Sequence, residues 1–162
     1  SIAPSSSGYA FTTQTSSNIN WINYSMGARI QFLTAGTVVA IGAQNVNGGN
    51  MAIYPDNSNT ASATVTILGT GSTSTTRNYK YTTLSSPVSV SANSIYRLAF
   101  KNTAGGYAYH NISAYDGTAT TSGNIKLLSG GYISVGKGGI ARPTTLNTST
   151  SYGSTDLIFL PS

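Results

Sequence analysis

The sequence PVSVSANSIYRLAFK, Pro87–Lys101, decides the fold that we expect for this chain. In its second half, Ile95–Lys101, apolar side chains alternate with Arg and Lys. The large apolar residues share one face of an extended chain: Tyr96, Leu98 and Phe100. Alternation with a period of two is typical of a strand that buries one face in an antiparallel sheet. The first half adds a short strand, Val88–Val90, and a turn at Ala92-Asn93, which together predict a hairpin-like unit.

Similar segments recur along the chain and predict further strands over Ala28–Leu33, Thr37–Ala43, Met51–Tyr54, Ala61–Leu68, Arg77–Thr82, Tyr107–Ala114, Asn124–Leu128, Tyr132–Val135 and Asp156–Leu160. Glycine-containing turns at Thr34-Ala35-Gly36 and Ser129-Gly130-Gly131 predict hairpins. Gly136–Thr150 is rich in Gly, Thr and Asn and predicts a long surface excursion. About ten short strands with no helix predict an all-β fold, a two-sheet antiparallel β-sandwich of jelly-roll type.

The composition favours the same fold class and a single domain. The chain has 162 residues, of which only 7% are charged, with three Asp and no Glu. Helices usually carry Glu, Lys, Ala and Leu, whereas this chain is rich in residue types that favour strands and turns. We interpret residues 1–20 as a polar lead-in, a linker or an edge strand, and residues 21–162 as one β-sandwich domain.

The charge distribution excludes some classes of partner. The formal net charge is +5, but the basic residues are spread singly along the chain, whereas nucleic-acid binders cluster them on a helix or stripe. We therefore expect no nucleic-acid binding, and a weak attraction to acidic glycans or a negatively charged cell envelope. No run of about 18 apolar residues is present, so the sequence predicts no membrane span.

Catalytic and metal-binding residues are not expected. His110, the only histidine, has Ser113 and Asp116 nearby, but no Gly-x-Ser-x-Gly motif exposes a nucleophilic serine. Glycoside hydrolysis needs two facing carboxylates, and each Asp here lies beside a turn or a strand start, where Asp normally caps the main chain. We interpret Asp56–Asn59 as a plain turn rather than a weak cation site. With no cysteine and one histidine, the sequence predicts no metal and no cofactor.

Aromatic residues in or next to expected loops are the best candidates for a binding site. Their flat rings can stack on a sugar ring, while Asn, Asp, Arg or His side chains hydrogen-bond the hydroxyl groups. Each aromatic side chain alone is more often a packing residue than a ligand contact, but these residues form a set carried by loops. We expect ligand contacts from Trp21, Tyr24, Tyr107, Tyr109, His110, Lys137 and Arg142.

Four segments carry a resemblance to a known family: GARIQF at Gly27–Phe32, AGTVVAI at Ala35–Ile41, AIY at Ala52–Tyr54 with its Asp-Asn turn, and SPVSVSANSIY at Ser86–Tyr96. They resemble a family of bacterial extracellular modules that is still described as a domain of unknown function. The resemblance covers about half the chain. It implies a β-sandwich of jelly-roll type, an extracellular location and a role in binding carbohydrate or a cell surface. The glycine-rich tail after Asn102 departs from that family and leaves the ligand face open.

A second, looser similarity is to the tip domains of trimeric bacterial or phage fibres, which share this composition and often a C-terminal strand such as Asp156–Leu160. We therefore expect a non-catalytic, secreted or cell-surface module that recognises carbohydrate on a cell surface or matrix, as a lectin-like adhesin does. The alternative is a homotrimeric fibre tip or structural domain that binds a protein or an envelope surface, with tyrosines buried at subunit interfaces.

Overall fold

The computed structural model describes residues 16–19, 23–43, 47–69, 79–102, 107–111, 123–148, 150–152 and 155–162. These residues form strands and no helix. The strands are β1 (Ser16–Ile19), β2 (Tyr24–Phe32), β3 (Gly36–Ala43), β4 (Gly49–Pro55), β5 (Ala63–Ile67), β6 (Lys80–Val90), β7 (Ile95–Asn102), β8 (Tyr107–Asn111), β9 (Ile125–Ser134), β10 (Thr145–Asn147), β11 (Thr150–Ser151) and β12 (Thr155–Pro161). The predicted all-β class is confirmed.

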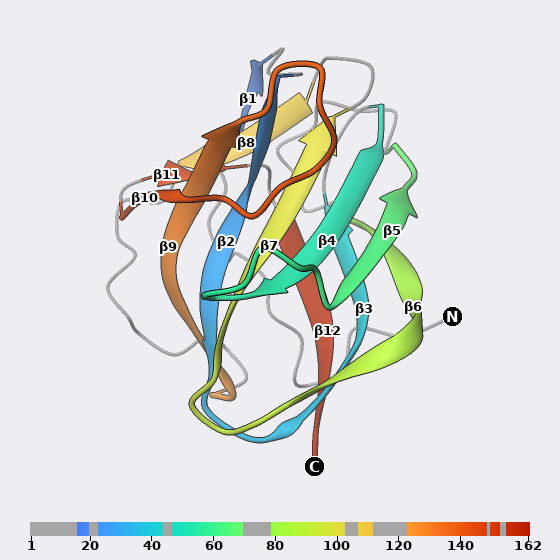
Figure 1. Ribbon diagram of the computed structural model, residues 1–162, viewed down its shortest axis with the longest axis vertical. Helices are drawn as coiled ribbons and strands as arrows, with labels where there is room; N and C mark the ends of the chain where they lie inside the picture. Colours follow the sequence, from blue (N-terminus) through green and yellow to red (C-terminus); the bar gives the residue numbers. More distant parts are fainter. Residues whose placement is uncertain are drawn as a thin grey trace.

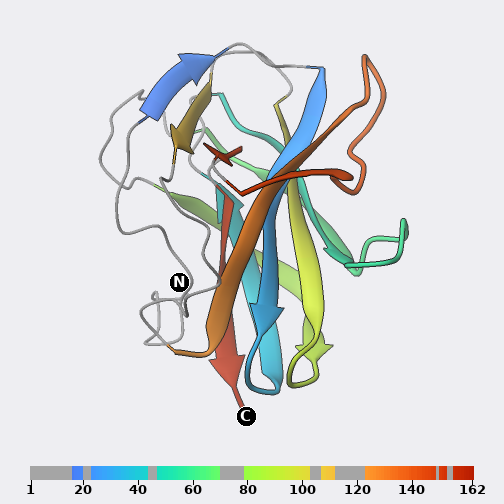
Figure 2. The ribbon, with the colours of Figure 1, turned by 90° about the vertical axis from the view of Figure 1, so that its left-hand side faces the viewer.

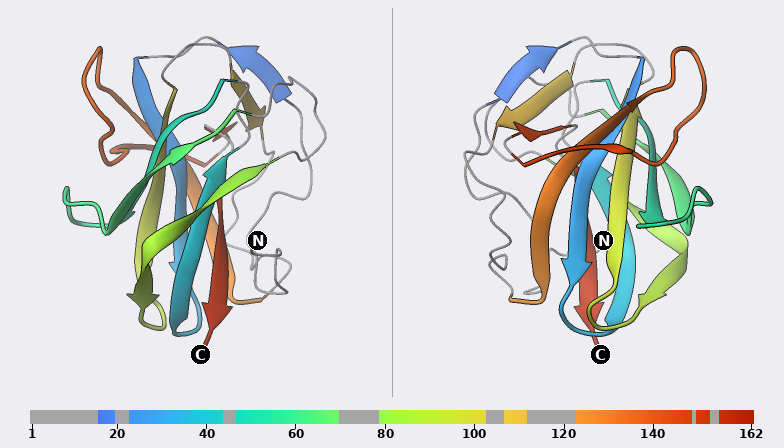
Figure 3. Two further views of the ribbon diagram at one scale, coloured as in Figure 1. Left: turned by 90° about the vertical axis from the view of Figure 1, so that its right-hand side faces the viewer. Right: turned by 60° about the vertical axis from the view of Figure 1, so that its left-hand side comes forward.

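Two antiparallel sheets pack face to face (Figure 1). The larger sheet has six strands in the order β10-β9-β2-β7-β4-β5, and the smaller has three in the order β12-β3-β6. The left view of Figure 3 faces the smaller sheet, and its right view faces the larger one. A further small sheet, β1-β8-β11, lies at one end of the sandwich (Figure 2). The predicted two-sheet β-sandwich is therefore confirmed.

Three strand pairs are nested in the sequence, with β4–β5 innermost, β3–β6 around it and β2–β7 outermost. The pair β3–β6 lies in the smaller sheet, and the pairs β2–β7 and β4–β5 lie in the larger one. The chain from β2 to β7 therefore crosses between the sheets and encloses the core. Wrapping of this kind occurs in jelly rolls, which have eight strands in two Greek keys. The six-and-three arrangement of the two sheets does not confirm the full jelly-roll connectivity.

The hairpins predicted at Thr34-Ala35-Gly36 and Ala92-Asn93 are wrong, because both turns carry the chain from one sheet to the other. The first leads from β2 to β3 and the second from β6 to β7. The two crossings are joined, since Phe32 N–H donates to Ser94 O at 2.9 Å and Asn93 N–H donates to Phe32 O at 2.6 Å. Alternation shows which face of a strand is buried, but both sheets bury a face in the same interior. The pattern therefore does not identify the partner strand.

The hairpin predicted at Ser129-Gly130-Gly131 is also wrong, because β9 runs unbroken through these residues. Neither glycine there has a positive φ, so both fit an extended strand. A side-chain carbon on Gly131 would lie 3.2 Å from side-chain atoms of Leu146 and Pro143. Glycine at this position makes room for a segment that packs over the strand, rather than making a turn.

The two separate strands predicted over Arg77–Thr82 and Val88–Val90 are joined in the structure, where β6 is continuous from Lys80 to Val90. Pro87 lies inside this strand and cannot donate a ladder hydrogen bond. The strand tolerates proline because β6 is at the edge of its sheet. Its pairing with β3 also shifts register between Val38 and Ala40.

The hydrophobic core lies between the two sheets, on the faces that the alternation predicts to be apolar. The largest fully buried side chains are Phe32, Phe100, Phe159, Met26, Ile30, Ile41, Met51, Ile53, Ile67 and Leu98. The ring centroid of Phe32 in the larger sheet lies 4.9 Å from that of Phe159 in the smaller sheet and 5.6 Å from that of Tyr96. Aromatic packing of this kind contributes both buried apolar area and favourable ring contacts.

A buried hydrogen bond links the two sheets at Ala28 and Thr155. The ladder between β2 and β7 is interrupted at Gly27 and Ala28. The Ala28 N–H instead donates to the Thr155 hydroxyl of β12, at 3.1 Å, and both residues are buried. A side-chain carbon on Gly27 would overlap the carbonyl oxygen of Leu98. The local geometry therefore requires a residue with no side chain.

We predict that Gly27→Ala lowers the free energy of unfolding by about 2 kcal/mol or more, because the added methyl group must displace the main chain of β7. Gly139→Ala is the matched control, since a side-chain carbon there meets no atom within 4 Å. The control should stay within about 0.5 kcal/mol of the parent protein. Equilibrium unfolding in urea measures both values, and equal stability of the two variants would contradict this account of Gly27.

Candidate functional site

Two arginines lie directly opposite each other on the outer face of the larger sheet. In β7 the residues Tyr96 and Leu98 pack against the core, so alternation turns Arg97 outward. In β2 the residue Ile30 is fully buried, and Arg29 faces outward in the same way. The antiparallel register pairs Arg29 with Arg97. Like charges at directly opposed positions destabilise a sheet, so this pair needs a compensating anion.

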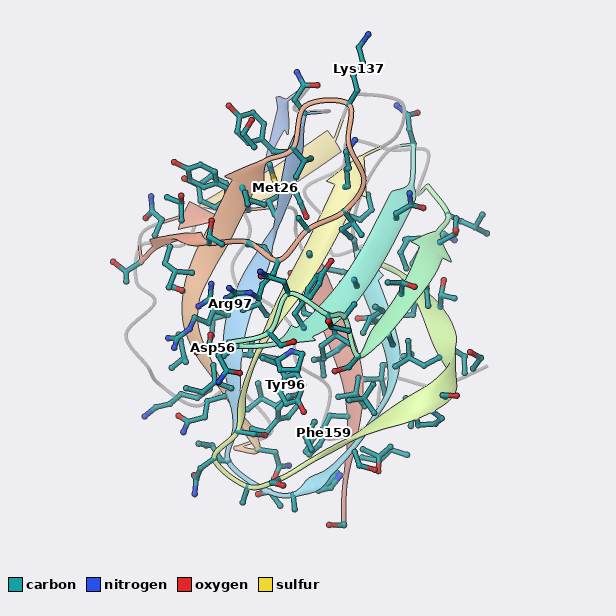
Figure 4. All side chains as sticks on the ribbon, in the orientation of Figure 1. Met26, Asp56, Tyr96, Arg97, Lys137 and Phe159 are labelled. Atoms are coloured by element: carbon teal, nitrogen blue, oxygen red, sulfur yellow. The ribbon has the colours of Figure 1, made fainter. Side chains whose placement is uncertain are left out.

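Asp56 supplies that anion. It follows β4 directly, and its main-chain N–H donates to Ile95 O of β7 at 3.0 Å. Arg29 binds its carboxylate through two hydrogen bonds, from Nε to Oδ1 at 2.8 Å and from Nη2 to Oδ2 at 2.9 Å. Arg97 Nε donates to the same Oδ1 at 2.7 Å. Figure 4 shows Asp56 and Arg97 together over the front of the larger sheet.

A third arginine reaches the same point from the segment that follows β9. Arg142 Nη1 donates to the main-chain oxygen of Asp56 at 2.5 Å, and Arg142 Nε donates to Asn59 Oδ1 at 3.0 Å. Arg97 Nη1 in turn donates to Pro143 O at 2.6 Å. These bonds hold the segment against the outer face of the sheet. We call Arg29, Arg97, Arg142 and Asp56 the arginine cluster.

The segment around Arg142, within the surface excursion that the sequence predicts for Gly136–Thr150, is held against the larger sheet by further hydrogen bonds. Its residue Ala141 is bound by Ser25 of β2, whose hydroxyl donates to Ala141 O at 2.6 Å and accepts from Ala141 N–H at 3.2 Å. The segment then pairs with β9 as strand β10. In Figure 1 it crosses in front of β2 and β7 before it reaches β10. The glycine-rich composition indicated a loop but not its contacts.

The electrostatics of the cluster are dominated by the arginines. Hydrogen bonding from Arg29, followed by the bond and the charge of Arg97, lowers the pKa of Asp56 from 3.8 to about 2, against the effect of its partial burial. The bond to Asp56 likewise raises the pKa of Arg29. Two guanidinium groups bind the carboxylate of Asp56 and a third binds its main-chain oxygen, so the cluster carries a net charge of +2.

Part of the cluster is accessible to solvent. The side chains of Arg29 and Asp56 are 25% and 26% exposed, and that of Arg97 is 12% exposed. Each arginine donates two hydrogen bonds to described residues. A guanidinium has more N–H donors than that, so each arginine retains N–H groups with no acceptor among the described residues. The cluster can therefore donate further hydrogen bonds to a bound group.

Polar residues continue the surface along β2 and β9. Gln31 follows Arg29 on the outward face, and the register pairs Gln31 with Lys126 of β9. Both residues are partly buried, and Gln31 Nε2 donates to Asn93 O at 3.3 Å. Ser129 of β9 pairs with Arg29, but its hydroxyl is closed to solvent and has no hydrogen-bond partner among the described residues. Lys126 adds a further positive charge to this side of the cluster.

Of the residues that the sequence predicts as ligand contacts, Arg142 belongs to the arginine cluster and Lys137 does not. Lys137 lies on an exposed turn that is closed by a hydrogen bond from Gly138 N–H to Val135 O at 2.8 Å. Gly136 precedes it with φ +57°, a conformation that favours glycine. Figure 4 places Lys137 at one end of the molecule, away from Asp56 and Arg97.

Tyr24 is in a separate group of tyrosines. Its ring packs edge-to-face on Tyr132 with centroids 6.0 Å apart, and Tyr132 packs in the same way on Tyr152 at 5.1 Å. All three side chains are partly buried. Tyr132 lies within β9 and not in a loop, because the hairpin predicted beside it does not form. Tyr24 therefore packs with other tyrosines, whereas Arg142 bonds to Asp56 and Asn59.

The other predicted contacts lie outside the described residues wholly or in part. Trp21 is outside them. For Tyr107, Tyr109 and His110 only the main chain is described, and it forms β8, which pairs with β1 and β11. These four expected ligand contacts stay predictions.

Sequence reasoning missed Arg29, Arg97 and Asp56 as site residues. The alternation places both arginines outward, but it does not show that their strands are neighbours in this register. The interpretation of Asp56 as a turn residue was partly informative, since Ser58 N–H donates to Pro55 O at 3.2 Å. Its carboxylate, however, binds two guanidinium groups. Among the described residues, no group of three or more His, Cys, Asp or Glu side chains could hold a metal ion.

No protein-family model matches this chain, and no curated protein shows significant similarity to it. The part of the chain that the structure describes contains no helix long and apolar enough to cross a membrane.

We predict that Asp56→Asn lowers the free energy of unfolding by about 1–2 kcal/mol near neutral pH, because two opposed arginines lose their shared carboxylate. Solvent screening at this partly exposed site keeps the value below that of a buried pair. The pKa of Asp56 is lower in the folded protein than in the unfolded chain. Its contribution is therefore complete above about pH 4 and is lost as the pH falls through about 2.

Denaturant unfolding of the parent protein and Asp56→Asn between pH 2 and pH 7 tests this prediction. The stability difference should be largest at neutral pH and should shrink steadily below about pH 4. A difference that is the same at pH 2.5 and pH 7 would show that the variant acts through packing and not through the ionised carboxylate.

Proposed function

We propose that the domain is a non-catalytic binding module that recognises carbohydrate on a cell surface or in an extracellular matrix. The observation that carries this proposal is the arginine cluster on the outer face of the larger sheet. It supplies several N–H donors beside the amide group of Asn59, held by strands β2 and β7 and two loops. Sugar hydroxyl and ring oxygens accept hydrogen bonds from such groups.

The described carboxylates support a role without catalysis. Glycoside hydrolysis needs two carboxyl groups that face each other across the bond to be cleaved. Asp56 is bound by two arginines in the larger sheet. Asp156 is buried in the smaller sheet, where it accepts hydrogen bonds from the Tyr81 hydroxyl and from Leu157 N–H. The two described carboxyl groups therefore belong to different sheets, and each is bonded within the protein. Asp116 lies outside the described residues.

An extracellular location is part of the proposal and follows from composition and from the resemblance to secreted modules. Serine, threonine, asparagine and glycine, and not ions, make most of the polar surface in a chain with 7% charged residues. Binding at one such site is expected to be weak, because a small polar patch excludes little water. Display of several copies side by side would raise the apparent affinity.

The alternative is a trimeric fibre tip or structural domain, which predicts an apolar or tyrosine-rich subunit interface. The exposed large apolar residues of the described chain are Leu68, Leu146 and Leu160. Leu68 follows β5 and Leu146 lies in β10, and these two strands are the opposite edges of the larger sheet. Leu160 lies in β12 of the smaller sheet. Single exposed leucines at separate edges need no partner. A solution mass of three chains would favour the alternative.

We predict that the purified domain binds a subset of glycans on an array and that Arg142→Gln weakens that binding by about tenfold, the loss expected for about 1.4 kcal/mol of charge-assisted hydrogen bonding. Lys137→Gln is the matched control, because it removes the same charge from an exposed turn away from the cluster. Binding by the control should stay close to that of the parent protein.

Three other outcomes have defined meanings. Loss of binding in Tyr107→Ala and Tyr109→Ala but not in Arg142→Gln would keep the carbohydrate function and move its site to β8. Equal losses in Arg142→Gln and Lys137→Gln would indicate general charge attraction with no defined site. No binding to any glycan, with a stable trimer in solution, would overturn the proposed function.

A further inference from the structure

We infer that the arginine cluster binds the oxyanion of an acidic sugar, a carboxylate or a sulfate group, as the part of the glycan that sets specificity. This inference rests on the proposed carbohydrate binding and names the class of ligand. Its support is the charge, the free donors and the rigidity of the cluster.

The first support is an imbalance of charge that a structural role does not require. One arginine would be enough to balance the charge of the Asp56 carboxylate. Three arginines meet Asp56 instead, and the register places Lys126 on the same side. The chain has only three acidic residues in total, so few groups are available to balance this charge. An oxyanion from outside the chain would relieve the repulsion between the guanidinium groups.

The second support is that the cluster already binds one oxyanion, its own Asp56. Arg29 holds both carboxylate oxygens through Nε and Nη2, and Arg97 Nε holds one of them. This fork is the geometry in which a guanidinium binds carboxylates and other oxyanions. The groups Arg29 Nη1, Arg97 Nη2 and Arg142 Nη2 have no acceptor among the described residues. They belong to three residues that bind Asp56, two through its carboxylate and one through its main-chain oxygen.

The third support is that the arginines are fixed before a ligand arrives. Arg97 is held at Nε by Asp56 and at Nη1 by Pro143 O, and it is only 12% exposed. Arg142 is held at Nε by Asn59 and at Nη1 by the main chain of Asp56. Side chains that are already ordered lose little conformational entropy when they bind a ligand, so even a small contact can contribute to affinity.

The decisive measurement compares glycans that differ only in their anionic group. The probes are an oligogalacturonate, the same oligosaccharide with its carboxyl groups reduced to the neutral sugar, and a sulfated galactan oligomer of similar length. Titration calorimetry at low and moderate salt measures the affinity of the parent protein for each. We expect at least one acidic probe to bind about tenfold tighter than the neutral one. The preferred acidic probe then identifies the oxyanion as carboxylate or sulfate.

Variants assign that preference to the cluster. Arg142→Gln should remove most of the preference for the acidic probe, and Arg142→Lys should restore part of it, because lysine keeps the charge but not the planar fork. Lys137→Gln should retain the preference in full. Thermal unfolding of each variant shows whether it is folded at the assay temperature. If Arg142→Gln is unfolded there, Arg29→Lys replaces it and is expected to weaken acidic-probe binding selectively.

The failures of the two proposals are distinguishable. Equal binding of neutral and acidic probes would overturn this inference and leave the carbohydrate function intact, and so would an acidic preference that survives Arg142→Gln. Binding of no glycan probe, neutral or acidic, would overturn both. A last outcome is that no glycan probe binds while inorganic sulfate at high concentration shifts the arginine Nε–H NMR signals. It would overturn this inference, because it would show an adventitious ion only.

Discussion

Burial of alternate residues of β2 and β7 between the two sheets is the constraint from which the candidate site follows. Ile30 and Leu98 face the core, so the residues next to them in their strands, Arg29 and Arg97, must face outward. The register of the two strands then places these positive charges opposite each other. Such a pair is unfavourable in a sheet unless an anion lies between them. Asp56, at the end of β4, meets that requirement with both of its carboxylate oxygens.

The same arrangement organises the outer surface of the larger sheet. The main chain of Asp56 and the side chain of Asn59 bind Arg142, and Arg97 binds the carbonyl of Pro143. The part of the segment after β9 that contains Arg142 and Pro143 is thereby held over β2 and β7. Gly131 permits this close packing, because any side chain there would press on Leu146 and Pro143. The charges, the path of the loop and the glycine in β9 on this face therefore depend on one another.

Because the chain has few acidic residues, this arrangement has more positive than negative charge. The chain contains three Asp residues, and of the two that the structure describes, Asp156 is buried in the smaller sheet. Among the described carboxylates, Asp56 alone binds the arginines on the larger sheet, so the arginine cluster keeps a net positive charge with ordered N–H donors. Such a surface is suited to reversible binding of polar or acidic groups. The proposed role as a binding module has this physical basis.

By itself the sequence determined the all-β class, the two-sheet sandwich and many of the strands, including the core positions Tyr96, Leu98 and Phe100, because alternation and turn residues are local properties of the chain. It did not determine that the turns after Phe32 and Val90 cross between sheets, or that β9 runs through Gly130 and Gly131. Partner choice depends on contacts between distant segments, and both sheets show the same pattern of burial. Only the tertiary structure brought Arg29, Arg97 and Arg142 to Asp56. These residues are far apart in the sequence, and their meeting depends on strand register and on the path of one loop.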